Sequence, residues 1–171
     1  MWREKLAIGM VGLLVACQPG TMTRQERAVQ EQAVQARLNG WAKAFSNRDV
    51  DSLATYYDSS AAMTFAWPDG DRTTGREQEA AKERQFFQTG RQVNLVLQNP
   101  TVEVLSSKVA LTTFRHAMDV IVGDVNPERR YFTGQGTIVW TRPDDKADWV
   151  IYAGQISETA PPPPPRAQRG R

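Results

Sequence analysis

One side chain of this sequence is suited to proton transfer near neutral pH: His116, the single histidine among 171 residues. Imidazole has a normal pKa of about 6.5, so small changes in its surroundings decide its charge. His116 lies within 109–122, a stretch with the alternation of a strand, on the same face as Phe114 and Met118. Three interpretations follow: a hydrogen-bonded interior histidine, a group that contacts a ligand, or a catalytic base.

A second acid–base candidate is Asp58, which lies at the end of an expected short helix, close to where a base would be needed. Its alternative role is to form the turn that follows that helix, as aspartate often does. One histidine does not make a His-rich metal site, and the acidic residues show no metal-ligand spacing. We therefore expect no metal and no cofactor.

The only cysteine, Cys17, follows a basic start and an apolar run over 6–16. This layout is typical of a secretion signal, and the run is too short to span a bilayer. The residues Leu14-Val15-Ala16-Cys17 resemble the lipobox of bacterial lipoproteins, in which the signal is cleaved before an acylated cysteine. The resemblance implies a membrane anchor at Cys17. Gln18 in place of aspartate favours the outer membrane, with the protein facing the periplasm.

Composition divides the chain into four segments. We expect a signal peptide over 1–16, a tether over 17–22, one domain over 23–158 and a Pro/Arg-rich disordered tail over 159–171. Of the 21 basic and 19 acidic residues, two basic and one acidic lie in 1–16 and three arginines follow Pro165, which leaves 17–160 with a net charge of −2. A nearly neutral domain argues against nucleic-acid binding.

The apolar periodicity of the domain predicts helices first and strands afterwards. A capping box at Thr23–Glu26 begins a long helix, and Asn47 is expected to adopt a left-handed turn after it. A shorter helix capped by Asp49 or Asp51 follows, and a third helix ends before Gly90. The expected strands span 61–67, 92–98, 101–105, 109–122, 131–142 and 148–157, with a bulge at Pro100 that joins the second and third into one bent strand.

Two stretches carry a family resemblance. "VQARLNGWAKAFSNRDVDSLATYYDSSA" and "GQGTIVWTRPDDKADWVIYAGQIS" resemble the opening and the ending of the SnoaL-like/DUF4440-like branch of the NTF2-like superfamily. The resemblance spans 34–157. It implies an α+β fold: an NTF2-like cone in which a curved antiparallel sheet wraps on three N-terminal helices, in the order α-α-β-α-β-β-β-β. It also implies an internal pocket and pairing into a homodimer through the sheet.

The chain departs from the enzymes of this superfamily at two places. Many members have two histidines on the last strand, where this chain has Ala153 and Gln155. Ketosteroid isomerases place a tyrosine on the first helix, where this chain has Trp41 and Phe45, which cannot stabilise an oxyanion. The departures make catalysis the less favoured interpretation.

The expected function is the binding of a small apolar or amphipathic molecule by a lipid-anchored cell-envelope domain. Two alternatives stay open: a SnoaL- or ketosteroid-isomerase-like enzyme that uses Asp58 or His116, and a dimeric interaction module. Gly134 and Gly136 would permit bending of the sheet or close approach of a ligand. The side chains predicted to line the pocket are Trp41, Phe45, Tyr57, Phe65, Trp67, Phe87, His116, Met118 and Gln155.

Overall fold

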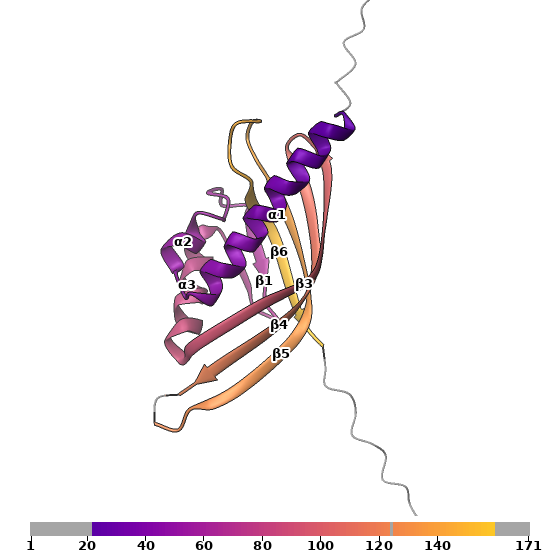
Figure 1. Cartoon of the computed structure of the whole chain (residues 1–171). Coiled ribbons are helices and arrows are strands. Elements are labelled where there is room, and N and C mark those ends of the chain that lie inside the picture. Colours follow the sequence, from indigo (N-terminus) through magenta and orange to yellow (C-terminus); the bar gives the residue numbers. More distant parts are fainter. Residues whose placement is uncertain (1–21, 124, 160–171) are drawn as a thin grey trace, which may run out of the picture.

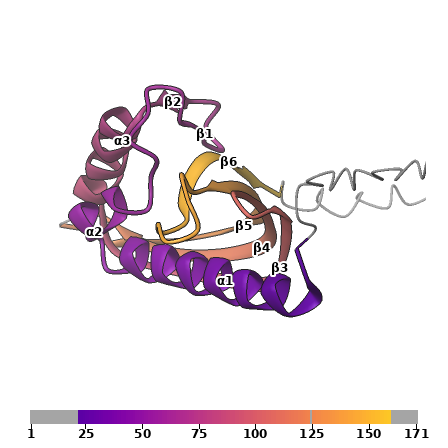
Figure 2. The same ribbon diagram turned by 90° about the horizontal axis from the view of Figure 1, so that it is seen from above.

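The computed structural model describes residues 22–123 and 125–159. A strongly curved six-stranded sheet wraps around the helices, and α1 and α3 lie on its concave side (Figures 1 and 2). The elements are α1 (Arg24–Ser46), α2 (Val50–Ala54), β1 (Thr64–Ala66), β2 (Arg72–Thr74), α3 (Arg76–Thr89), β3 (Gly90–Ser106), β4 (Val109–Val122), β5 (Glu128–Thr141) and β6 (Val150–Glu158).

Helix α1 begins where the sequence predicts. The Thr23 hydroxyl accepts a hydrogen bond from the Glu26 amide, and the Glu26 carboxylate accepts one from the Thr23 amide, so the capping box is confirmed. The left-handed residue after α1 is Arg48 (φ 59°) rather than the predicted Asn47, which keeps helical angles. Arg48 is held there because its guanidinium donates to the Phe87 and Arg91 carbonyls.

The sheet has the order β2-β1-β6-β5-β4-β3. Strands β3 to β6 form an antiparallel meander, whereas β1 lies parallel to β6, so the sheet is mixed. The parallel contact begins at Ile151, whose amide donates to the Tyr56 carbonyl and whose carbonyl accepts from the Asp58 amide. The short strand β2, which the sequence analysis did not anticipate, pairs with the outer side of β1.

The long strand β3 bends at one irregular point. The register of β3 against β4 shifts between Gln98 and Thr101, and Asn99 has a positive φ of 49°. This confirms the predicted bulge at Pro100 and the joining of two expected strands into one. Because β3 bends there, the sheet can close over α1 instead of lying flat beneath it.

The interior between sheet and helices is mostly aromatic, with Trp41, Tyr57, Phe65 and Trp140 fully buried. On β5 a Cβ added at Gly136 would overlap the Phe114 ring of β4. A Cβ added at Gly134 would lie 2.7 Å from the His116 Nε2. The space over Gly136 is therefore filled by the Phe114 ring, and the space over Gly134 by the Ser157 carbonyl and the His116 ring, so neither is kept for a ligand.

Several predictions concern segments that the structure does not describe. The signal peptide, Cys17 and the residues after 159 lie outside the described residues, and the structure leaves them as predictions. Within residues 22–123 and 125–159 no helix is long and apolar enough to cross a membrane.

Candidate functional site

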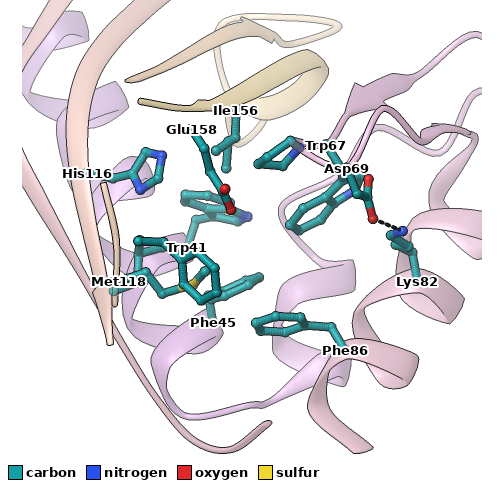
Figure 3. A pocket seen from close by; sticks show the side chains of 13 residues that line it. Trp41, Phe45, Trp67, Asp69, Lys82, Phe86, His116, Met118, Ile156 and Glu158 are labelled. Atoms are coloured by element: carbon teal, nitrogen blue, oxygen red, sulfur yellow. Dashed lines mark hydrogen bonds and ion pairs between the residues drawn. The ribbon is translucent and has the colours of Figure 1, made fainter. Parts of the chain in front are cut away.

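A cavity of about 130 Å³ lies between the concave face of the sheet and helices α1 and α3 (Figure 3). Its volume is close to the ~150 Å³ of an engineered protein cavity that holds one benzene molecule. It therefore has room for a group the size of a single ring.

Aromatic rings form most of the cavity wall. Trp41 and Phe45 lie one turn apart on α1 and are buried at its floor, and Trp67 directly follows β1. The Phe45 ring stacks on Trp67 with 6.2 Å between centroids and lies 5.7 Å from the ring of Phe86 on α3. Phe132 of β5 also lines the cavity. These rings make the wall hydrophobic and leave it few hydrogen-bonding groups.

An ion triad occupies one side of the cavity mouth. The Lys82 ammonium donates to the Asp69 carboxylate at 2.6 Å and also to the Asp71 carboxylate. The bond from Lys82 lowers the pKa of Asp69, and the two carboxylates raise the pKa of Lys82. The positive charge of Lys82 is thus compensated within the protein.

Glu158, at the end of β6, also lines the cavity, and its carboxylate points into the space beside His116 (Figure 3). Its side chain makes no hydrogen bond or ion pair with any of the described residues. Among the carboxylates of the cavity lining, it is the one without a cationic partner in the described part of the chain.

His116 projects from β4 into the same cavity and is 3% exposed. Its Nε2 lies 3.2 Å from the Ser157 carbonyl oxygen, so Nε2 carries the proton and donates it. Its Nδ1 is buried and has no partner among the described residues. Burial lowers the pKa of His116, which keeps the imidazole neutral at pH 7.

Behind the aromatic wall lie two fully buried acids, Glu79 and Glu83, one turn apart on α3. Tyr57 donates its hydroxyl proton to Glu83 and accepts a hydrogen bond from the Trp41 indole N–H at 3.0 Å. The Trp67 indole N–H donates to Glu79 at 3.3 Å. The acid pair therefore holds Trp67 directly, through Glu79, and Trp41 indirectly, through the Tyr57 hydroxyl that bonds Glu83.

Burial disfavours the charged form of both acids. Burial raises the pKa of Glu83 to about 8, and it raises the pKa of Glu79 as well. Glu79 also accepts a hydrogen bond from the Thr73 hydroxyl. One oxygen of each carboxyl group, Glu79 Oε1 and Glu83 Oε2, is buried without a partner in the described part of the chain.

The structure brings some predicted site residues together and separates others. Asp58 lies away from the cavity, where its carboxylate accepts a hydrogen bond from the Ser60 amide at 2.7 Å, as the turn-forming interpretation expects. Five predicted lining residues line the cavity: Trp41, Phe45, Trp67, His116 and Met118. Three are buried in the surrounding core: Tyr57, Phe65 and Phe87.

Gln155 lies on the outer side of the sheet, where it borders a shallow surface hollow. The cause is a bulge: Val139 pairs with Ala153 whereas its neighbour Trp140 pairs with Ile151, so Tyr152 is an extra residue. If side chains simply alternated along the strand from the buried Ile151, Gln155 would point inward. The extra residue reverses the faces, which places Ile156 and Glu158 in the cavity instead.

Neither the buried acid pair nor the triad around Lys82 was predicted from the sequence. Glu83 and Glu79 precede Phe87 by four and eight residues, so they share its face of α3. This four-residue spacing from a predicted buried phenylalanine was the feature of the sequence that could have indicated two buried acids. Within residues 22–123 and 125–159 no group of three or more His, Cys, Asp or Glu side chains is arranged to hold a metal ion.

Comparison with known proteins gives a family and a fold. A family model described as "SnoaL-like domain" matches residues 34–161, and no curated protein matches the chain. Among solved structures, an NTF2-like superfamily protein from Salmonella enterica has a TM-score of 0.70 at 20% identity, and the match covers 78% of this chain and 94% of that one.

Two further structures extend the comparison. A hexachlorocyclohexane dehydrochlorinase of type 2 has a TM-score of 0.70 at 12% identity, with 80% of this chain and 89% of that one covered. The association domain of C. elegans CaMKII has a TM-score of 0.59 at 20% identity, with 78% and 98% covered. At these identities the likeness shows the α+β fold with its curved sheet and no particular activity.

Proposed function

This chain belongs to the SnoaL-like domain family and has the NTF2-like fold, and from that premise we propose that it binds a small apolar or amphipathic molecule in its cavity. The observation that carries the proposal is the cavity itself, whose aromatic wall surrounds about 130 Å³ and whose few polar groups lie at one side and at the mouth. Concave, mostly apolar sites with a few polar groups are typical of small-molecule binding.

The binding proposal is tested by filling the cavity. Leu95 on β3 lines the cavity, whereas its neighbour Val96 is 46% exposed on the opposite face of the strand. We expect benzyl alcohol, a neutral one-ring probe, to bind the wild type in isothermal titration calorimetry. Leu95→Trp should abolish that binding, and the matched control Val96→Trp should retain it. If Leu95→Trp and Val96→Trp bound benzyl alcohol equally well, the probe would bind outside the cavity and the proposal would be wrong.

The location of the domain is a second part of the proposal. The lipobox-like residues ending at Cys17 support a lipid-anchored protein of the bacterial outer membrane that faces the periplasm. A chain carried by several acyl groups stays on the membrane, since one acyl chain alone gives marginal attachment. Metabolic labelling with an alkyne-bearing palmitate tests this: label should enter the wild type in a bacterial host and should be absent from Cys17→Ser.

We also propose that two copies pair through the outer face of the sheet. Val96 and Tyr152, exposed by 46% and 39%, lie on this face, and one similar structure is itself described as an association domain. Sedimentation velocity should show a dimer that Val96→Asp dissociates. Val29→Asp, which alters an exposed valine on α1, should leave the dimer intact.

His116 supports a second candidate function, proton abstraction from a bound substrate. It is a neutral imidazole in the cavity wall, and a lowered pKa leaves it in the form that accepts a proton. An enzyme of this kind should accelerate the exchange of the α-protons of cyclohexanone in D₂O, followed by proton NMR. His116→Gln should remove the acceleration, and Asp58→Asn should retain it, because Asp58 lies away from the cavity.

A further inference from the structure

We propose that the cavity selects an organic cation, with a tertiary or quaternary ammonium group placed between Glu158 and the aromatic wall. The inference rests on the proposed binding function and adds the charge of the ligand to it. Three features of the described residues carry it: the balance of charge, the shortage of free hydrogen-bond donors and the aromatic nature of the wall.

The charge at the cavity is negative. The triad of Asp69, Asp71 and Lys82 carries a net charge of −1, and Glu158 adds a second negative charge. His116 does not offset them, since it is neutral at pH 7. The uncompensated carboxylate of Glu158 projects into the space that the ligand would occupy (Figure 3). A cation beside this carboxylate is attracted by its charge, and because Glu158 is exposed, solvent screens part of that attraction.

An anion would find little free donor capacity in the side chains of this wall: the third N–H of Lys82 lies beside two carboxylates that would repel the anion. Four cavity-lining side chains carry N–H groups, and each already donates to an acceptor of the protein. Trp41 donates to Tyr57 and Trp67 to Glu79, both behind the wall. The other two are the ion-paired Lys82 and the carbonyl-bonded His116.

With their N–H groups turned toward the acid pair, the tryptophans leave ring surface on the cavity side. Trp67 is half-buried and stacks on Phe45, and Phe86 and Phe132 contribute two more rings. The face of an aromatic ring attracts a cation, and that of tryptophan does so best. An alkylated ammonium needs few or no acceptors, because methyl groups replace its N–H bonds. Such a group suits a wall in which neither the Glu158 carboxylate nor the buried His116 Nδ1 has a donor partner among the described residues.

The experiment compares three probes of nearly the same shape: choline, its uncharged carbon isostere 3,3-dimethylbutan-1-ol, and the anion 3,3-dimethylbutanoate. Isothermal titration calorimetry with the full chain should show choline binding at least tenfold more tightly than the neutral alcohol, and the anion binding more weakly than both. Glu158→Gln should weaken choline binding about tenfold and change the affinity for the alcohol less than twofold.

The control variant is Glu128→Gln at the far end of β5, where the native carboxylate pairs with Arg130 outside the cavity. It should leave all three affinities unchanged. Equal affinity for choline and the alcohol, or equal weakening of both by Glu158→Gln, would overturn the cation inference and leave the binding proposal standing. If none of the three probes binds and benzyl alcohol also fails, both proposals are wrong.

Discussion

Replacing Glu83 by glutamine tests the buried acid pair through the pH dependence of stability. Glu83 is fully buried and accepts a hydrogen bond from the Tyr57 hydroxyl. Burial raises its pKa from 4.5 to about 8, and the charge of Glu79 makes a smaller contribution in the same direction. The folded protein therefore keeps the Glu83 proton up to about pH 8, whereas the unfolded chain releases it near pH 4.5. Because the folded state binds the extra proton between these values, the free energy of unfolding falls as pH rises through that window.

The magnitude follows from the two pKa values. Each pH unit inside the window costs about 1.4 kcal/mol, and with partial titration at both ends the loss between pH 5 and pH 8 is about 3–4 kcal/mol from Glu83 alone. Glutamine does not titrate, so Glu83→Gln removes this slope. An amide at the position of Oε2 has two N–H donors where the neutral carboxyl group has one O–H, and the additional unpaired donor costs about 1–3 kcal/mol. The variant is therefore identified by its slope and not by its stability at one pH.

The assay is urea unfolding followed by tryptophan fluorescence at half-unit steps from pH 5 to pH 8. Titrating groups distant from Glu83 are shared by wild type and variant and cancel in the difference between the two curves, whereas Glu79 is coupled to Glu83 and contributes to that difference. Glu77→Gln, which alters an exposed carboxylate on the same helix, should keep the wild-type slope. Parallel curves for wild type and Glu83→Gln would refute the reasoning, because Glu83 would then ionise as an ordinary surface acid.

Three other predictions follow from contacts around the cavity. Gly136→Ala should destabilise the fold by about 1–3 kcal/mol in urea unfolding, because the new Cβ would overlap the Phe114 ring; an unchanged midpoint would contradict the contact. Thr73→Val should cost about 1–3 kcal/mol by removing the hydroxyl that donates to the buried Glu79, whereas Thr73→Ser should be nearly neutral. Choline affinity in calorimetric titrations should fall on acidification with a midpoint below pH 6.5, since His116 then becomes a second cation; the same decline in His116→Gln would exclude that cause.

The parts of the fold that could be predicted are those set by local rules. The capping box at Thr23 and the spacing of Val34, Leu38, Trp41 and Phe45 determine α1 and the face that it buries. A proline in an otherwise regular strand pattern located the bend of β3. These features depend on neighbouring residues in the sequence, so no knowledge of distant contacts was needed.

The missed features depend on tertiary contacts. Glu79 and Glu83 look like surface acids of a charged helix until Tyr57, Thr73 and the two tryptophans are placed beside them. Strand β2 has three residues and exists because β1 offers it an edge. The inward position of Glu158 depends on one extra residue in β6, which no local pattern marks.

The parallel pairing of β1 with β6 has a consequence for biosynthesis. Strand β1 pairs with β2 on one edge and with β6 on the other, and β6 (Val150–Glu158) is synthesised more than eighty residues after β1. A nascent chain that stops short of β6 can form the helices and the β3–β5 meander. In that chain β1 has no β6 to pair with, and the cavity lacks Ile156 and Glu158. Such non-local closure slows folding. The domain is thus expected to acquire its native interior only near the end of synthesis.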